Sequence, residues 1–458
     1  MKINPINLLK VFCFVLAGTT SIQAQDWPQF LGPEGNSTSP QKNLLREWPE
    51  NGPEVLWTTD VNVGYGGPVV KDGKVYLLDR EDKFGDHLRC FDLETGEELW
   101  KFSYESPGEV EFPGSRSVPA LDGNYVYSCG QNGELYCIDV NTQQPVWKKN
   151  VWTDFGGEPA KVGEDHFAGL AGGTHFPMWG IAQCPLIFGD LLIVASQTPE
   201  VGVVAYNKEN GNVVWKTPSL GTLGYVSPAI AKIDGEDQVV MITASSGGFG
   251  GGEAKPSNVV GINPQNGDTL WTYSNWSCWI PSSSAYDAGD NKILIVGGYR
   301  AGASMIQIEK NGDEYKVNEL FKTAEFGEHT KPPLSVNGYY YAQFSNNETR
   351  DGLVCMDGEG NIMWKTKRDP AFNKGSMIVA DGLILATDGE TMLYLIEPDP
   401  SGFKPLASAT ILKESGMTGN ERVIGIVGTN QNWAPLALAD GKLLIKGQRQ
   451  MVCLKLIE

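Results

Sequence analysis

One pattern of apolar runs and turns recurs along most of this chain, and it limits the possible folds more than any other feature. A small residue or proline opens an apolar run, an Asp-Gly type turn follows, and a second apolar run comes next. Beyond a variable loop, a third apolar run ends in Asp or Asn, turns on Thr-Gly or its equivalent, and closes on tryptophan. Glycine turns supply the positive φ of tight hairpins, and alternating apolar residues bury one face of a strand. Each copy therefore predicts one antiparallel sheet of four strands.

The copies can be counted from their closing residues. The first runs from Gly67 to Lys101, and later copies close on Trp147, Trp215, Trp271, Phe321 and Trp364. A seventh copy keeps the turn but has no tryptophan, and an eighth stops at the chain end without a fourth strand. A closing strand around Trp57 has no copy in front of it, so it can complete the eighth sheet. We predict an all-β, eight-bladed β-propeller of four-stranded antiparallel blades, closed by this N-terminal strand pairing into the C-terminal blade, because such closure removes an open sheet edge.

Residues 1–25 have the composition of a secretory signal peptide. Lys2 and Lys10 make the start basic, residues 11–18 form a short apolar core, and Ala24 lies at a small-residue cleavage site. The core is too short to cross a bilayer, and no later run reaches the roughly 20 apolar residues of a spanning helix. We therefore expect residues 26–458 to form a single propeller that is periplasmic or secreted, with no membrane span.

The chain is acidic, with 36 Lys and Arg against 55 Asp and Glu and a net charge of −19. This balance argues against nucleic acid and against anionic membrane surfaces as partners. We expect a monomer that binds a protein or carbohydrate ligand at one face of the ring.

The turn and closing strand of each copy read D-x-x-T-G-x-x-x-W, and this motif resembles the repeat of the PQQ-like propeller family. The full motif stands at Asp92, Thr95, Gly96 and Trp100. Partial copies stand at Asp139, Thr142 and Trp147, at Asn207, Gly211 and Trp215, at Asn263, Gly267 and Trp271, and at Asp357, Gly360 and Trp364. Residues 26–39 also look like the start of many secreted proteins with this repeat. The resemblance implies the fold but not one function, because the family includes quinoprotein alcohol dehydrogenases and also BamB, an outer-membrane assembly factor that does no chemistry.

The cysteines bear on the dehydrogenase alternative. Quinoprotein dehydrogenases typically carry two adjacent cysteines against the quinone, and no two cysteines are adjacent here. We therefore expect no cofactor and no metal site, with PQQ and calcium as the alternative. Cys90, Cys137, Cys355 and Cys453 occupy one repeat position and are interpreted as small buried residues in separate blades. Cys129 lies on a strand neighbouring that of Cys137, so this pair could form a disulfide.

Two regions hold candidate site residues. At the predicted mouth of the central channel, aromatic and cationic residues precede the innermost strands, and these suit a planar anion, a sugar or an extended peptide; packed side chains that plug the channel are the alternative. The candidates at this mouth are Tyr65, Arg116, Trp179, Tyr225, Trp279, His329, Lys331, Lys374, Asn432 and Trp433. The second region is the long insertion over 151–179, where His166 and His175 are either candidate bases or ligands, or incidental residues of a surface loop.

The intact repeats and the missing enzyme motifs favour a non-catalytic binding or scaffold protein. The alternative is an enzyme on the same propeller, either a PQQ-dependent dehydrogenase or a polysaccharide lyase. A lyase needs a Tyr or His base beside a cation that neutralises a uronate, and Tyr225, His175, His329 and Arg116 are the candidates. Convergence of His175, Arg116 and Tyr225 in one pocket would favour the enzyme, whereas their separation would favour the scaffold.

Overall fold

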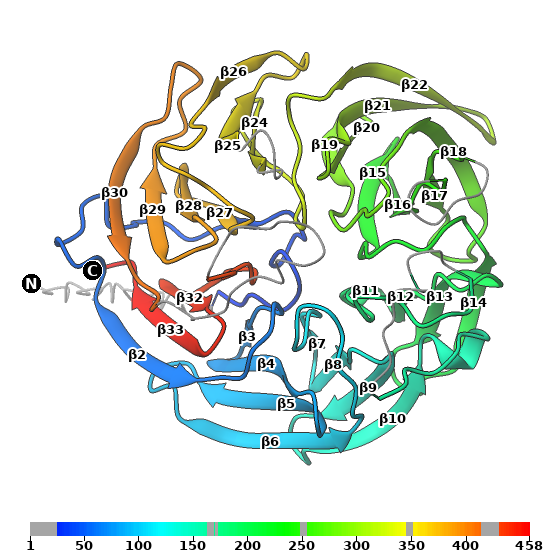
Figure 1. Ribbon diagram of the computed structural model, residues 1–458, viewed down its shortest axis with the longest axis horizontal. Helices are drawn as coiled ribbons and strands as arrows, with labels where there is room; N and C mark the ends of the chain where they lie inside the picture. The colour runs from blue at the N-terminus through cyan, green and yellow to red at the C-terminus, as the bar shows by residue number, and fades with distance from the viewer. Residues whose placement is uncertain (1–24, 163–168, 170–172, 248–253, 345–350, 414–429) are drawn as a thin grey trace, which may run out of the picture.

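The computed structural model describes residues 25–162, 169, 173–247, 254–344, 351–413 and 430–458. It is a ring of eight sheets around a central axis, seven of them with four strands and one with five (Figure 1). The four strands of each blade are antiparallel and follow one another from the axis to the rim, and the added fifth strand of one blade pairs in parallel. The predicted eight-bladed propeller is therefore confirmed. The predicted signal peptide lies outside the described residues, apart from Gln25, and stays a prediction.

The first four blades follow one another along the chain, each from its inner to its outer strand. Blade 1 holds β3 (Val69–Lys71), β4 (Lys74–Glu81), β5 (Gly85–Asp92) and β6 (Glu98–Glu105). Blade 2 holds β7 (Ala120–Asp122), β8 (Tyr125–Cys129), β9 (Glu134–Asp139) and β10 (Gln144–Asn150), followed by the short 3-10 helix η1 (Thr153–Phe155). Blade 3 holds β11 (Leu186–Phe188), β12 (Leu191–Ala195), β13 (Val201–Asn207) and β14 (Val213–Pro218). Blade 4 holds β15 (Ala229–Ile233), β16 (Glu236–Ile242), β17 (Ser257–Ile262) and β18 (Thr269–Trp276).

The last four blades complete the ring in the same order. Blade 5 holds β19 (Tyr286–Gly289), β20 (Lys292–Gly297), β21 (Gly302–Asn311) and β22 (Glu314–Thr323). Blade 6 holds β23 (Leu334–Val336), β24 (Tyr339–Phe344), β25 (Gly352–Met356) and β26 (Ile362–Lys365). Blade 7 holds β27 (Met377–Ala380), β28 (Leu383–Thr387), β29 (Met392–Ile396) and β30 (Pro405–Thr410), with β1 (Thr38–Ser39) added at its inner edge. Blade 8 holds β31 (Ala437–Ala439), β32 (Lys442–Lys446), β33 (Gln450–Lys455) and, as its outer strand, β2 (Val55–Asp60).

Closure of the ring depends on strand β2. It pairs antiparallel with β33, and Trp57 lies opposite Cys453 in the register. The same register places Trp100 opposite Cys90 in blade 1. The N-terminal strand thus completes the C-terminal blade, as the orphan closing strand predicted.

The closing tryptophans connect each blade to the next. The indole N–H of Trp57 donates to the carbonyl of Leu93 in blade 1 at 2.9 Å, and the ring covers the turn glycine of that blade. Gly96 has φ +71°, and a Cβ there would lie 2.5 Å from the Trp57 ring. Equivalent turn glycines face Trp147, Trp215 and Phe321. The Thr-Gly turn therefore needs glycine both for its left-handed backbone and for the tryptophan of the preceding blade.

The cysteines are buried and unbridged. All seven in the described part of the chain are free thiols, so Cys129 and Cys137 do not form the disulfide that their neighbouring strands allowed. Cys137, Cys355 and Cys453 each lie opposite a closing tryptophan. Their shared repeat position therefore reflects packing beneath an indole ring.

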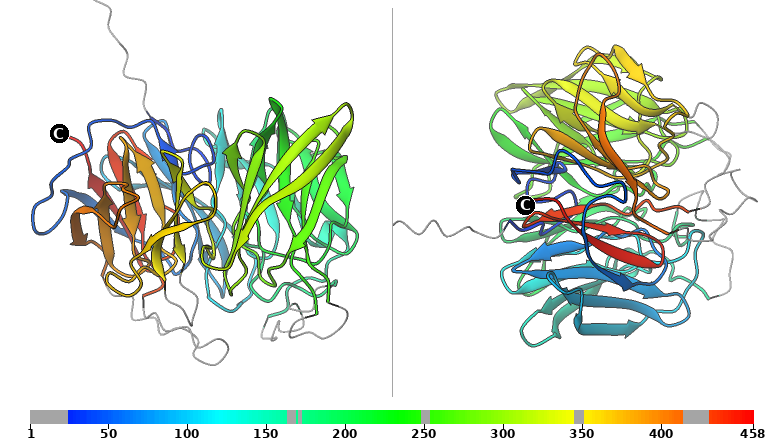
Figure 2. Two further views of the ribbon diagram at one scale, coloured as in Figure 1. Left: turned by 90° about the horizontal axis from the view of Figure 1, so that it is seen from above. Right: turned by 90° about the vertical axis from the view of Figure 1, so that its left-hand side faces the viewer.

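The segment before β2 crosses one face of the ring, along the upper side in the left view of Figure 2. Trp27 exchanges two backbone hydrogen bonds with Val70 of β3, and β1 pairs in parallel with β27. Within the described residues, no helix is long and apolar enough to cross a membrane.

Candidate functional site

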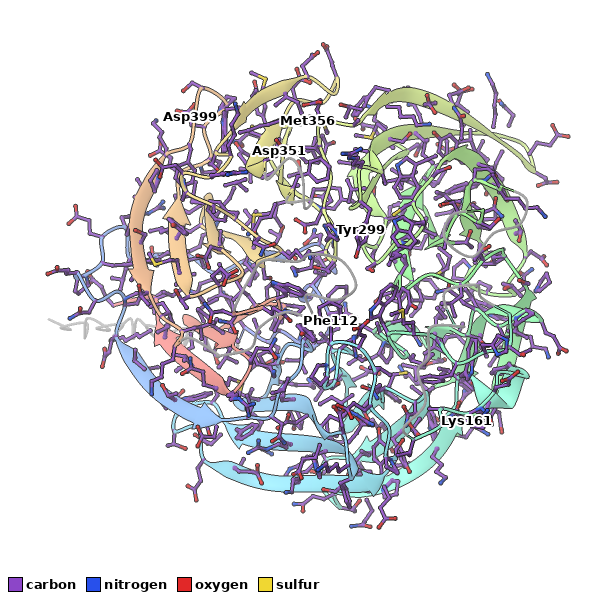
Figure 3. All side chains as sticks on the ribbon, in the orientation of Figure 1. Phe112, Lys161, Tyr299, Asp351, Met356 and Asp399 are labelled. Atoms are coloured by element: carbon purple, nitrogen blue, oxygen red, sulfur yellow. The ribbon has the colours of Figure 1, made fainter. Side chains whose placement is uncertain are left out.

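A cavity of about 170 Å³ lies on the ring axis. The loops that lead into the inner strands of all eight blades contribute to it, and Phe30 of the N-terminal segment closes one side. Its wall consists of Phe30, Tyr65, Phe112, Arg116, Trp179, Ala182, Cys184, Tyr225, Ser227, Ile280, Ser282, Tyr299, His329, Thr330, Lys331, Lys374, Trp433 and Pro435. Figure 3 shows Phe112 and Tyr299 near the middle of the ring, whereas Asp399 and Lys161 lie at the rim.

Aromatic rings form two sides of this cavity. On one side, the rings of Tyr65 and Trp433 lie 5.5 Å apart at 31°, and Phe112 contacts both. On another, Trp179 meets Tyr225 edge-on at 5.3 Å. Flat or ring-shaped ligands suit such walls, because aromatic faces stack on sugars and on other π systems.

Arg116 provides the first of three cations. Its guanidinium donates to the carbonyls of Glu111, Phe112 and Gly114 and lies 5.7 Å from the centre of the Tyr65 ring. Burial lowers the pKa of Arg116 to about 10, so the group is charged at neutral pH. Within the described residues no carboxylate forms a salt bridge with it.

Lys331 is the second cation, and its ammonium is held by the protein. It donates to Thr330 Oγ1 at 2.8 Å and to the carbonyls of Lys374 and Trp433 at 3.2 and 2.9 Å. Burial lowers the pKa of Lys331, whereas the nearby Glu328 carboxylate raises it. Glu328 accepts backbone N–H groups from His329 and Gln343, and burial raises its own pKa. Lys331 therefore ties the loops of blades 6, 7 and 8 together through its three hydrogen bonds.

Lys374 is the third cation and has no such partner. Its side chain is buried, and its ammonium lies 4.4 Å from the centre of the Trp433 ring. Among the described residues nothing accepts a hydrogen bond from this ammonium. Burial lowers the pKa of Lys374 to about 8; the Glu328 carboxylate opposes this shift only in part, and Lys331 adds to it. A buried, unpaired cation is costly unless a ligand supplies the counter-charge.

Several polar atoms of the wall also lack partners. His329 Nδ1 and the indole nitrogens of Trp179 and Trp433 are buried without a hydrogen bond from the described part of the chain. Burial holds the pKa of His329 well below its usual value, so the imidazole is neutral. Buried polar groups are nearly always paired, so unpaired ones on a cavity wall indicate that a ligand or water pairs with them there.

The backbone of the wall is strained at three residues. Phe112, Tyr299 and Lys374 have φ values of +61°, +52° and +59°. Side chains other than glycine rarely adopt this region, and such outliers cluster at functional sites. The strain aims two aromatic rings and the unpaired ammonium at the axis.

The predicted site residues fall into two groups. Eight line the axial cavity: Tyr65, Arg116, Trp179, Tyr225, His329, Lys331, Lys374 and Trp433. Trp279 packs behind the wall against Tyr299, and Asn432 is buried, with its amide donating to the carbonyl of Glu390. His175 is exposed and lies 3.4 Å from Glu158, away from the axial cavity. His166 lies outside the described residues.

Three aromatic wall residues were absent from the sequence prediction: Phe30, Phe112 and Tyr299. Phe112 lies only four residues before Arg116 in a loop that the repeat already places at the channel mouth, so a wider window would have included it. Tyr299 reaches the cavity from the loop between β20 and β21, where no repeat position marks it. Phe30 precedes all the repeats, so their pattern gives no information on its place.

The fold and this axial cavity define a PQQ-like propeller with a ligand-sized pocket at its axis. Residues 85–278 and 179–400 match a family model described as outer membrane protein assembly factor BamB. Because these matches cover more than half of the sequence, the chain belongs to this PQQ-like, BamB-type propeller family.

Curated relatives are quinoprotein dehydrogenases that are much longer than this chain. The chain is 30% identical to the quinoprotein alcohol dehydrogenase PedH of Pseudomonas putida over 242 residues, which is 50% of this chain and 32% of that protein. It is 23% identical to the quinoprotein ethanol dehydrogenase of Pseudomonas aeruginosa over 298 residues, covering 62% of this chain and 40% of that enzyme. The similarity thus spans about a third of the length of these enzymes.

Solved structures show the same fold at low identity. A europium-containing methanol dehydrogenase superposes with a TM-score of 0.58 and 13% identity, covering 92% of this chain and 89% of that one. BamB from Moraxella catarrhalis superposes with a TM-score of 0.51 and 12% identity, covering 87% and 98%. One neighbour is named as an enzyme and the other is not, so the shared fold does not choose between the two kinds of function.

The axial cavity fits only part of what a calcium-bound quinone needs. Its cationic and aromatic wall suits the acidic groups of a planar quinone such as PQQ. Calcium, however, requires several oxygen ligands and above all carboxylates, and none of the described wall residues is an acid. No cluster of three or more His, Cys, Asp or Glu side chains in the described part of the chain could hold a metal ion. The residues therefore do not fit calcium.

Proposed function

We propose that this protein is an exported, non-catalytic binding propeller that holds an acidic ligand in its axial cavity, either an acidic glycan or an acidic segment of a partner protein. One observation carries the proposal: Lys374 is a buried cation with no acceptor among the described residues, and the described part of the surrounding wall includes no carboxylate. A ligand carboxylate would supply the missing charge and a charge-assisted hydrogen bond.

The neighbouring groups support the same ligand class. Arg116 is a second cation without a carboxylate partner, and the Tyr65 and Trp433 rings lie between it and Lys374. A sugar ring or a peptide side chain stacked on these rings would place its acidic groups near both cations. Export fits the expected signal peptide over 1–25, and we infer that the mature protein works in the periplasm or outside the cell.

Calorimetry with matched probes tests the proposal. The probes are a trigalacturonate, its neutral methyl ester and a poly-glutamate peptide, each titrated into the mature protein. We expect at least one acidic probe to bind, its affinity to fall with added salt, and Lys374→Met to weaken it about tenfold or more, as expected for loss of a charged hydrogen bond. Lys148→Met, on the exposed outer strand β10, removes the same charge and should change nothing. Equal binding of acidic and neutral probes, or binding that Lys374→Met leaves unchanged, would refute the proposal.

Catalysis on the same propeller is the second candidate, and the 30% identity to a quinoprotein dehydrogenase favours it. The dehydrogenase form has no calcium ligand set among the described residues. The lyase form keeps Arg116 and His329 on one wall but not His175. Burial raises the pKa of Tyr225, which disfavours its phenolate as a base. Turnover of alcohols with added PQQ and calcium, or unsaturated product from acidic polysaccharides, would favour an enzyme over the binding protein.

A further inference from the structure

A second cavity, of about 490 Å³, lies beside the axial cavity. Phe30, Cys184 and Ser227 line both cavities, so the two are neighbours that meet at these residues. The second cavity is bounded by the N-terminal segment over 29–36 and by the inner strands β11, β15 and β19 of blades 3, 4 and 5. It is therefore on the face that the N-terminal segment crosses.

The N-terminal segment covers only part of the channel lining. Its backbone pairs with the inner edge of blade 1 at Val70, with blade 7 through β1, and with blade 2, where Leu121 N–H donates to the Pro28 carbonyl at 2.8 Å. The inner strands of blades 1, 2, 7 and 8 are accordingly mostly buried. The chain thus uses its own extended segment to cover inner edges on one side of the channel.

The inner strands of blades 3 to 5 are not covered in this way. No residue of β11 or β19 is fully buried, and the first two residues of β15 are only half-buried. Most of the side chains left partly open on these strands are apolar: Leu186, Ile187, Phe188, Ala229, Ile230, Tyr286 and Ala288. Within the described part of the chain, the one backbone group of these three strands that bonds to a neighbouring blade is Lys232 N–H, which donates to the Asp287 carboxylate.

The charges around this cavity have one predominant sign. Glu34, Asp237 and Asp287 line it, against the single cation Lys232. Lys232 is already within 3.6 Å of Asp237. The lining therefore combines apolar walls, free strand edges and an excess of negative charge.

We propose that this second cavity, which we call the β-edge cavity, binds an extended segment of a partner protein. The segment pairs its backbone with an inner edge of blades 3 to 5, as residues 27–39 do on blades 7, 1 and 2. Its alternate side chains are apolar and fill the wall, and a Lys or Arg meets the acidic lining. This site is distinct from the acidic-ligand site, because it is bounded by the inner strands of blades 3 to 5 and its charged residues have the opposite predominant sign. Among the described wall residues the two sites share Phe30, Cys184 and Ser227.

Selection of random decapeptides displayed on phage, with the mature protein as bait, tests the proposal. We expect enriched sequences to alternate apolar residues and to contain Lys or Arg. Ile187→Trp should fill the cavity and weaken the enriched peptide about tenfold or more. Val146→Trp, at an exposed position of β10, adds the same ring elsewhere and should have no effect. Glu34→Gln should weaken binding about twofold at low salt, and Lys374→Met should leave it unchanged.

Backbone pairing is tested on the peptide itself, without any change to the protein. Only alternate N–H groups of a bound strand face its neighbour. N-methylation at one set of alternate positions should therefore reduce affinity about tenfold or more, whereas the other set should be tolerated. Tolerance of both sets, enrichment of acidic peptides, or equal capture by the Ile187→Trp variant would overturn the proposal.

Discussion

Replacing Lys374 by methionine tests the central electrostatic argument, because it removes a buried cation and keeps an apolar chain of similar length. Burial lowers the pKa of Lys374 from an ordinary 10.5 to about 8. A shift of about 2.5 units at about 1.4 kcal/mol per unit means that the charged form costs about 3 kcal/mol of folding free energy. The cation–π contact with Trp433 returns about 1–2 kcal/mol, so Lys374→Met should stabilise the ligand-free protein by roughly 1–2 kcal/mol at pH 7.

The lowered pKa of Lys374 determines how the stability difference between wild type and variant changes with pH. Between pH 8 and 10.5 the unfolded chain keeps the Lys374 proton while the folded protein releases it. The wild-type free energy of unfolding therefore gains from this residue as pH rises through that window. The cost is fully present below pH 8 and absent above about 10.5, so the advantage of Lys374→Met must shrink between pH 7 and pH 10.

Thermal and urea midpoints of the two proteins at pH 7 and pH 10 provide the assay. We expect the variant to be more stable by a few degrees at pH 7, with a smaller difference at pH 10. Lys148→Met serves as the control, since Lys148 is exposed on β10. A destabilised variant at pH 7, or an advantage that does not change with pH, would refute the view that Lys374 is a buried, uncompensated charge.

Three further predictions follow from the packing. Gly96→Ala should lower the free energy of unfolding by about 1–3 kcal/mol more than Gly73→Ala does. Both glycines have φ near +70°, but only Gly96 faces a ring, that of Trp57. Equal losses of stability in urea unfolding would mean that the ring contact adds nothing. The seven buried thiols should react with Ellman's reagent only after denaturation, since burial raises the pKa of Cys90 to about 12; rapid reaction of the native protein would contradict this. His175→Ala should leave acidic-ligand binding unchanged in calorimetry, because His175 is exposed beside Glu158 and does not line the axial cavity; weaker binding would place it in the site.

The repeat predicts the scaffold well because the same physical demands recur in every blade. Trp57 could be assigned to the eighth blade from sequence because only that blade lacked a closing strand. The four cysteines could be assigned to separate blades because each occupies the position that lies under a closing residue. Such features are local or periodic, so one sequence is enough to reveal them.

The site was less accessible to the same reasoning. The positions just before the inner strands could be predicted to face the channel, and Arg116 and Lys374 occupy two of these positions. The positive φ of Phe112 and Tyr299 could not be predicted, since nothing in a sequence of aromatic and polar residues requires a left-handed backbone. The path of the N-terminal segment was also hidden, because residues 26–39 have no second copy with which to compare them.

The eight copies agree where they build the ring and differ where they meet its axis. One position of the repeat lies three residues before the proline, or its equivalent, that opens each inner strand. In the eight blades this position holds seven kinds of side chain: Tyr65, Arg116, Ala182, Tyr225, Pro281, Thr330, Lys374 and Asn432. If this position served only to plug the channel, one well-packed apolar residue could be repeated around the ring. Instead the cations at this position fall in blades 2 and 7, on either side of the Tyr65 and Trp433 rings of blades 1 and 8, whereas blades 3 to 6 carry Ala, Tyr, Pro and Thr there. The departures from the repeat therefore break the symmetry of the ring at its axis, which is what the proposed acidic-ligand site requires.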